Sequence, residues 1–238
     1  MMVTDVRPLR NRVCHSLVWC NETMKRDNEP EVVLALDVDG VLLDPDRGGR
    51  GSWQQELQPR FGIHPDRLFE AFFAPSWQAI LTGDLSIEPT LARALCSIGF
   101  DGSVEAILDC WFESDFYVVE EVASAVRDWA LQGVRVVFAT NQEHRRAAYL
   151  WENLRQHVPV NSIMYSADIG YTKDDPRFFS AVEERLGIES RHVVLVDDIV
   201  ENVFQARQSG WSGVHFAGQV TWRSEIQRCL DIVRDEPQ

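Results

Sequence analysis

The sequence predicts an α/β fold: a Rossmann-like parallel sheet with helices on both faces, and a group of helices inserted after the first strand. Two observations lead to this prediction. From residue 117 onward, short apolar runs alternate with stretches whose apolar residues recur every three or four positions, which is typical of parallel strands joined by crossover helices. Between residues 47 and 116 only the helical spacing occurs. We therefore expect an α/β core of residues 31–46 and 117–238, interrupted by a helical cap of residues 47–116.

The first core strand is predicted at residues 32–36, five apolar residues that lead directly into Asp37-Val38-Asp39-Gly40. A continuous apolar run of this length, bounded by turn-forming residues, is typical of a strand that is buried on both faces. Two carboxylates at the end of such a strand are costly unless a cation or hydrogen bonds compensate for them. Asp37 and Asp39 are therefore the first candidate site residues.

Two segments beside this strand are expected to be loosely held. Residues 1–30 are polar and show no clear period, so we interpret them as a leader, with an edge strand near residues 16–19 or an interaction arm as alternatives. Three glycines within residues 48–51 are incompatible with regular structure and predict a hinge where the chain leaves the core.

The remaining elements alternate regularly along the chain. Further strands are predicted at residues 134–139, 162–166, 192–196 and 213–216. Helices are predicted at residues 120–131, 143–157, 176–186, 201–208 and 221–233, several of them stopped by a glycine or a proline. In the inserted segment, aromatic residues recur at helical spacing, which favours a packed bundle interior over a cofactor-binding surface.

Composition disfavours several classes of function. The net charge of −14 leaves no basic surplus for binding nucleic acid or an anionic membrane surface. The five cysteines are widely spaced and contain no C-x-x-C pair, so we expect free thiols rather than a zinc or redox site. No apolar run approaches the roughly 20 residues of a membrane span. We expect a cytoplasmic protein.

Polar residues collect where the predicted strands end. The residues concerned are Asp37 and Asp39 after the first strand, Thr140 and Asn141 after the second, Lys173 after the third, and Asp197 and Asp198 after the fourth. In open α/β sheets ligands bind at the carboxyl ends of the strands, so these side chains should share one edge. Lysine occurs only at positions 25 and 173, which makes Lys173 conspicuous.

This set of residues predicts a magnesium site. Several carboxylates that face one point repel each other unless a cation lies among them. An all-oxygen ligand set without clustered histidine or cysteine suits Mg²⁺ rather than Zn²⁺. Because Mg²⁺ held by few carboxylates commonly shares its coordination with a phosphate, Lys173 and the Thr140 hydroxyl are expected to bind the other phosphate oxygens. The expected chemistry is phosphoryl transfer.

Four motifs carry a family resemblance. DVDGV at residues 37–41, FATNQ at residues 138–142, IGYTKDDPRFF at residues 169–179 and LVDDIVEN at residues 195–202 resemble, in their order, the four motifs of the haloacid dehalogenase (HAD) superfamily. The helical insertion resembles the α-helical cap of the relatives that carry it between the first and second motifs. One position departs from the pattern, because Asp174 follows Lys173 where a proline is usual, and this change is expected to loosen the lysine loop.

The resemblance implies a role for each site residue. Asp37 would be the nucleophile that forms an aspartyl-phosphate, and Asp39 would protonate the leaving oxygen and then activate water. Thr140 and the Asn141 backbone would bind the phosphoryl group, and Lys173 would orient Asp37 and neutralise charge. Mg²⁺ would be held by Asp37, the backbone carbonyl of Asp39, Asp198, and Asp197 either directly or through water. Asn202 would support the acidic pair.

Within this superfamily, two sequence features bear on the reaction. Dehalogenases lack the second aspartate of the first motif, which is present here as Asp39. Phosphonate-cleaving relatives need a cap lysine, and residues 45–116 contain none. The expected function is therefore a Mg²⁺-dependent phosphatase acting on a small phosphorylated metabolite, as a monomer or homodimer. A phosphosugar mutase of the same fold and a non-catalytic phosphate-binding or regulatory relative stay open as alternatives.

Overall fold

The computed structural model describes residues 31–44, 46 and 52–235. The expected leader at residues 1–30, including its possible edge strand, lies outside the described residues. The same holds for the predicted hinge at residues 48–51.

The core is one parallel sheet of five strands in the order β3-β2-β1-β4-β5. The strands are β1 (Val33–Leu36), β2 (Arg135–Thr140), β3 (Ser162–Tyr165), β4 (Val193–Asp197) and β5 (Ser212–His215). Each lies within one or two residues of its predicted position. Because β1 is central and Leu36 pairs with both Phe138 and Val196, Asp37 is placed in the middle of the carboxyl edge.

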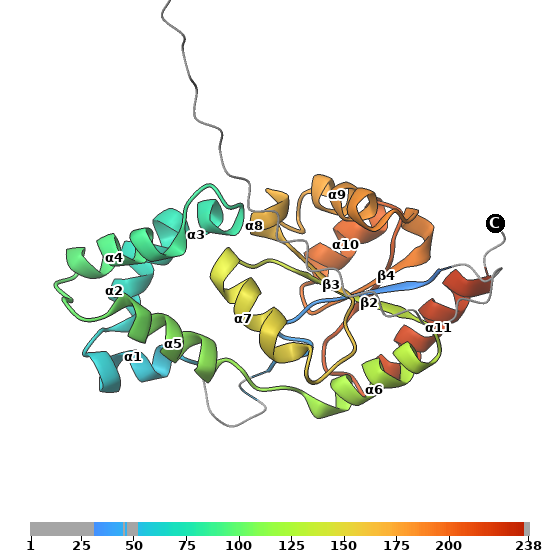
Figure 1. The fold of residues 1–238 in the computed structure, drawn as a ribbon, viewed down its shortest axis with the longest axis horizontal. Helices are drawn as coiled ribbons and strands as arrows, with labels where there is room; N and C mark the ends of the chain where they lie inside the picture. The colour runs from blue at the N-terminus through green and yellow to red at the C-terminus, as the bar shows by residue number, and fades with distance from the viewer. Residues whose placement is uncertain (1–30, 45, 47–51, 236–238) are drawn as a thin grey trace, which may run out of the picture.

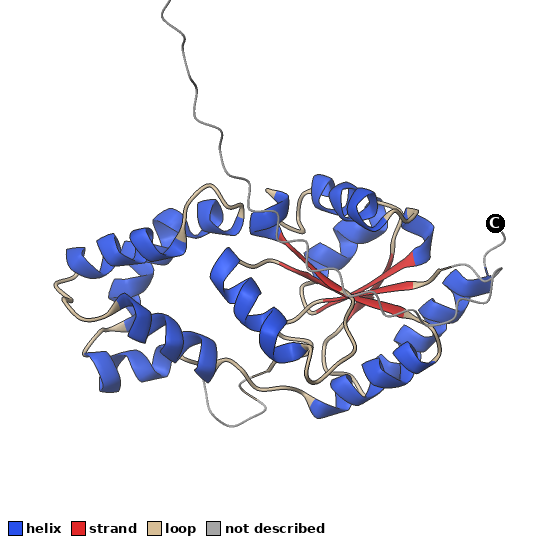
Figure 2. Cartoon of the chain, in the orientation of Figure 1, coloured by secondary structure: helices blue, strands red, loops and turns tan. Residues whose placement is uncertain are grey.

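Helices cover both faces of this sheet (Figure 2). On one face, α6 (Glu120–Leu131), α7 (His144–Leu154) and α11 (Trp222–Asp235) pack against Leu34 and Leu36 of β1. On the other face, α9 (Pro176–Leu186) and α10 (Val200–Gln208) pack against Val33 and Ala35. The short α8 (Ser166–Ile169) follows β3. The alternation of β1 side chains between the two clusters explains its uninterrupted apolar sequence, and the predicted fold class is confirmed.

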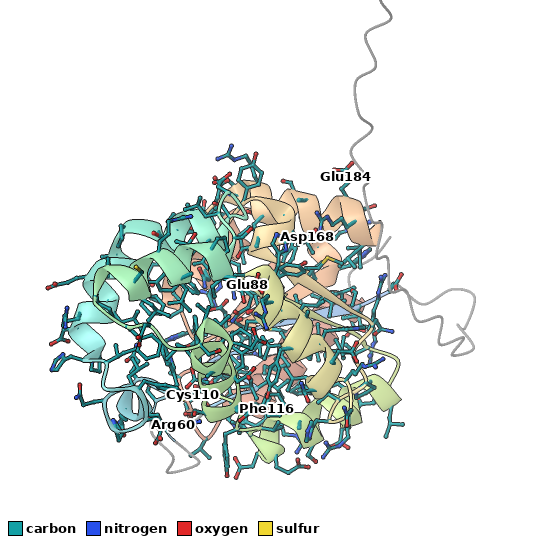
Figure 3. The ribbon with its side chains drawn as sticks, turned by 60° about the vertical axis from the view of Figure 1, so that its left-hand side comes forward. Arg60, Glu88, Cys110, Phe116, Asp168 and Glu184 are labelled. Carbon is teal, nitrogen blue, oxygen red and sulfur yellow. The ribbon has the colours of Figure 1, made fainter. Side chains whose placement is uncertain are left out.

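The segment between β1 and α6 forms a separate group of helices, seen at the left of Figure 1. It contains α1 (Gln54–Phe61), α2 (Pro65–Leu68), a π-helical turn at Phe69–Phe73, α3 (Ala74–Leu81), α4 (Ile87–Ser97) and α5 (Val104–Ser114). These helices enclose their own apolar cluster, in which Trp53 stacks on Trp111 with ring centroids 4.9 Å apart. Arg60 of α1 donates to the buried Cys110 sulfur of α5 (3.2 Å; both residues are labelled in Figure 3).

Hydrogen bonds and ion pairs connect the helical group to the α/β core. Arg145 of α7 donates to Glu88 of α4 (2.6 Å) and to both carboxylate oxygens of Glu105 of α5 (2.8 and 2.7 Å; Glu88 is marked in Figure 3). Gln78 of α3 donates to the Thr172 hydroxyl, next to Lys173 (3.3 Å). The division into a core domain and a cap domain at residues 47 and 116 stays a prediction. Within the described ranges, no helix has both the length and the apolar character needed to cross a membrane.

Candidate active site

The site is built around Asp37, which follows the central strand. The Asp37 backbone continues the sheet by donating to the Val196 carbonyl (2.9 Å), so its position is fixed by the register of β1 and β4. The Asp37 side chain is held at both oxygens. Oδ1 accepts from the Val38 N–H (2.8 Å), and Oδ2 lies 2.7 Å from the Lys173 ammonium. The two contacts hold the Asp37 carboxylate in one orientation.

Lys173 is a buried cation among acids. Its side chain is 1% exposed, and its Nζ contacts Asp37 Oδ2, Asp197 Oδ2 (2.6 Å) and the Ala139 carbonyl (3.1 Å). All three hydrogens of the ammonium therefore have acceptors. Burial alone would lower the pKa of Lys173, but the charges of Asp37 and Asp197 outweigh it and raise that pKa. The lysine stays charged and bridges the ends of β1 and β4.

Asp197, the last residue of β4, is fully buried and fully bonded. Besides Lys173, its carboxylate accepts from the Ile199 N–H (2.8 Å) and from the Asn202 amide, which lies 3.1 and 3.2 Å from its two oxygens. Asn202 thus occupies the supporting place that the sequence resemblance implied. With both its oxygens engaged, Asp197 holds Lys173 in place between the ends of β1 and β4.

Asp198 lies next to Asp197 but is less buried. Its carbonyl accepts from His215 Nε2 (2.9 Å), which fixes its backbone against β5. Its carboxylate lies against Gly40, where a Cβ would stand 2.2 Å from Asp198 Oδ2. Gly40 also has a φ of +78°, in the left-handed region that favours glycine. The turn after β1 therefore requires glycine for two reasons, its backbone conformation and the space for Asp198.

The carboxylates of Asp37, Asp197 and Asp198 could hold a metal ion. Each offers an oxygen, and these atoms lie within 4.8 Å of one another. Three carboxylates with one ammonium leave a formal charge of minus two, which a divalent cation would balance. Burial, and to a smaller extent the charge of Asp197, raises the pKa of Asp37 to about 7 and also raises the pKa of Asp198. An all-oxygen donor set of this charge fits Mg²⁺.

The Asp39 carboxylate lies outside this cluster and has its own partners. Its Oδ1 lies 2.6 Å from an Arg146 nitrogen, and its Oδ2 accepts from the Gln142 amide. The two aspartates therefore have different cationic partners: Asp37 pairs with Lys173, and Asp39 pairs with Arg146. Coordination of a metal by the Asp39 backbone carbonyl stays a prediction.

Sequence reasoning did not single out Arg146 or Gln142. Gln142 ends the FATNQ motif, and Arg146 is in the first turn of α7, whose N-terminus is capped by the Glu143 carboxylate. A signal was present, because Arg145 and Arg146 occupy the start of a helix, where the macrodipole favours acids rather than bases. Adjacent arginines at the start of a helix indicate acidic partners outside that helix. Arg145 pairs with Glu88 and Glu105, and Arg146 pairs with Asp39.

Thr140 and Asn141 lie at the end of β2, beside the lysine loop. The Asn141 side-chain oxygen accepts from the Lys173 N–H (2.9 Å), which ties that loop to the neighbouring strand. Thr140 is buried. Asp174, at the usual proline position, accepts a hydrogen bond from Thr172. The roles of Thr140 and Asn141 in binding a phosphoryl group stay predictions.

Known proteins resemble this chain in sequence and in fold. The model of the haloacid dehalogenase-like hydrolases matches residues 32–210. Flavin mononucleotide hydrolase 1 (chloroplastic) of Arabidopsis thaliana is 25% identical over 190 residues, which cover 77% of this chain and 71% of the relative.

Solved structures share the fold at low sequence identity. A HAD family enzyme from Bacteroides thetaiotaomicron, in complex with magnesium and inorganic phosphate, has a TM-score of 0.65 at 17% identity, covering 79% of this chain and 96% of that one. L-2-haloacid dehalogenase from Xanthobacter autotrophicus has a TM-score of 0.57 at 18% identity, covering 79% and 78% of the two chains. Because the family model spans most of the sequence and the sheet carries the expected acids at its carboxyl edge, this chain belongs to the haloacid dehalogenase-like hydrolases.

Proposed function

We propose that this chain is a Mg²⁺-dependent phosphatase that hydrolyses a small phosphomonoester through an aspartyl-phosphate on Asp37. The observation that carries the proposal is the arrangement of Asp37. It is a carboxylate held by Lys173 beside two further acids, at the centre of the sheet edge where α/β folds bind ligands. A carboxylate that is oriented in this way, with a cation at one oxygen, is suited to attack phosphorus.

The residues divide the reaction between them. An oxygen of Asp37 forms a bond to phosphorus while the bond from phosphorus to the leaving oxygen breaks. Asp39 gives its proton to that leaving oxygen, which departs as an alcohol. Asp39, now a carboxylate, then takes a proton from the water that attacks the aspartyl-phosphate, so that phosphate is released and both acids return to their starting states.

Asp37, Asp198 and the Asp39 carbonyl would hold Mg²⁺, with Asp197 beside them. When bound, Mg²⁺ would neutralise the charge of the phosphoryl oxygens. The ammonium of Lys173 would contribute to the same end from the buried side of the site, and the Thr140 hydroxyl and Asn141 N–H would contact the remaining oxygens.

Two comparisons support phosphoryl chemistry over halide displacement. The Bacteroides neighbour was solved with magnesium and inorganic phosphate, and the Arabidopsis relative is named a flavin mononucleotide hydrolase. The presence of Asp39 in this chain agrees with that reading, because only protonation of a leaving oxygen needs a second acid. The helical group lies close to the site, because Gln78 donates to Thr172, next to Lys173, and Trp111 lies against Arg146, the partner of Asp39. This closeness favours small substrates over phosphoproteins. A cytoplasmic location and a monomeric or homodimeric state stay predictions.

The test is phosphate release from a panel of sugar, nucleotide and organic-acid phosphates, with flavin mononucleotide included, in the presence of Mg²⁺. We expect turnover of at least one substrate by the wild-type protein, loss of turnover with EDTA, and loss of turnover in Asp37→Asn. Asp101→Asn, which removes an exposed carboxylate from the helical group, should behave as wild type. Undiminished turnover in Asp37→Asn would contradict the mechanism, and isomerised sugar phosphate without phosphate release would indicate a mutase instead.

A further inference from the structure

Arg146 is a buried cation that the predicted phosphatase residues do not include. It is 3% exposed, although it lies in the first turn of a helix. One of its nitrogens forms the 2.6 Å ion pair with Asp39 Oδ1. With Gln142 bonded to Oδ2, both oxygens of Asp39 are held, and the carboxylate has one defined orientation.

The other face of the guanidinium is held by the inserted helices. Its central carbon lies 5.9 Å from the Trp111 ring centroid and 5.8 Å from that of Phe112, both on α5. These distances are within the range of cation–π attraction. Trp111 is in turn fixed by stacking on Trp53. Arg146 therefore connects the aromatic interior of the helical group to the side chain of Asp39.

This arrangement is costly for stability. The second terminal nitrogen of Arg146 is buried and has no hydrogen-bond partner among the described residues, and an unsatisfied buried donor costs about 1–3 kcal/mol. An apolar side chain of similar length would pack against the two rings without that cost. A buried charged residue with an unsatisfied donor, at a place where an apolar residue would cost less, is typical of a functional position.

We propose that Arg146 is a positioning residue for Asp39. Clamped between the rings of α5 and the Asp39 carboxylate, its guanidinium aims Asp39 at the leaving oxygen when the helical group lies against the core. The inference rests on the proposed function, and it deepens that function by making proton delivery dependent on a contact with α5. Arg146 itself need not touch the substrate for this role.

Leaving-group dependence separates this role from a merely structural one. An alkyl phosphate needs a proton on its leaving oxygen, whereas p-nitrophenyl phosphate releases a stable anion and needs little assistance. General acid catalysis typically contributes 10²–10⁴-fold. We expect Arg146→Gln to lower kcat/KM for an alkyl phosphate by at least tenfold and to change kcat/KM for p-nitrophenyl phosphate by less than threefold. The comparison uses kcat/KM because it reports only the steps up to loss of the leaving group and excludes the later hydrolysis, in which Asp39 also takes part. Arg146→Lys keeps the positive charge but not the planar guanidinium, and its effect should be intermediate between those of wild type and Arg146→Gln.

The decisive measurement is a double-mutant cycle with Asp39→Asn. If Arg146 acts through Asp39, adding Arg146→Gln to Asp39→Asn causes no further loss of kcat/KM for the alkyl phosphate, because the group it positions is already gone. Trp111→Leu should reproduce the leaving-group pattern of Arg146→Gln, and Trp111→Phe should retain wild-type behaviour. Arg155→Gln, which removes an exposed arginine just after the same helix, serves as the control.

The outcomes distinguish the inference from the function on which it rests. A wild-type protein without Mg²⁺-dependent turnover overturns both. With an active wild type, equal losses for the two leaving groups, or losses that multiply in the double mutant, overturn the positioning role alone. Thermal unfolding of each variant shows which of them are folded, and Arg146→Lys and Trp111→Leu keep the test complete if Arg146→Gln does not fold.

Discussion

Replacing Gly40 by alanine should weaken magnesium binding, although Gly40 is not one of the predicted metal ligands. Gly40 has a φ of +78°, and an added Cβ would stand 2.2 Å from Asp198 Oδ2 and 2.4 Å from its Cγ. Ordinary van der Waals contact begins near 3.4 Å. The Asp198 carboxylate would therefore have to retreat by about 1 Å, whereas metal sites tolerate ligand displacements of only about 0.2 Å.

Two contributions to the effect can be separated. The left-handed backbone costs a non-glycine residue about 1–2 kcal/mol, which corresponds to a fall in Tm of roughly 2–8 °C for a chain of this size. The displaced carboxylate adds a loss of magnesium affinity. Disturbing the orientation of a metal ligand typically costs about 10–100-fold in affinity, so we expect at least a tenfold weaker Kd for Gly40→Ala.

Gly187→Ala is the matched control. Gly187 ends α9 with a φ of +66°, and no atom lies within 4 Å of its Cβ position. It therefore incurs the same kind of backbone strain without displacing a ligand. Mg²⁺ titration by calorimetry and thermal unfolding with and without Mg²⁺ would be measured for both variants. Equal magnesium affinities in the two variants would refute the reasoning, because strain alone would then account for everything that Gly40→Ala does.

Two further predictions concern the charges around Asp37. Lys173→Met should destabilise the protein by about 3–5 kcal/mol, because it leaves Asp37 and Asp197 buried without their cation; denaturant unfolding should show the loss, and a loss that Mg²⁺ fails to reduce would contradict it. The pKa of Asp37 is raised by burial from 3.8 to about 7, so this acid stabilises the metal-free fold fully below pH 4, and that contribution is lost as the pH rises through 7. The free energy of unfolding of the metal-free wild type, relative to that of Asp37→Asn, should fall between pH 4 and 7. Saturating Mg²⁺ should reduce this fall. A difference between the two proteins that does not change with pH would contradict the assignment.

The strands were predictable because each buried strand is a continuous run of apolar residues. The apolar residues of β1 alternate between two clusters on opposite faces, so every position had to be apolar, and the run ends where the site begins. Strand ends shifted slightly, since Thr140 and Asp197 are the last residues of β2 and β4. The backbone pairing of each strand includes its first polar residue, whereas a prediction from hydropathy ends the strand at the last apolar residue.

The acids and Lys173 were predictable from the rule that parallel strands deliver ligands at one edge. Arg146 was not, because its meeting with Asp39 depends on how α7 lies against the end of β1, and no local pattern in the sequence encodes that angle. Trp111 was interpreted as bundle interior. It is buried in that interior, and one ring face also serves Arg146, a double use that spacing alone does not reveal.

The two aspartates of the first motif differ in what holds them, and this difference orders the proposed reaction. The Asp37 contacts with Lys173 and Val38 lie entirely within the α/β core, so attack on phosphorus needs nothing from the helical group. The Asp39 contact runs through Arg146 to α5, so proton delivery does. It follows that weakening the contact of α5 with Arg146 should slow aspartyl-phosphate formation from substrates with poor leaving groups and leave that step almost unaffected for good ones. A single two-residue spacing thus connects one acid to the fixed sheet and the other to the inserted helices.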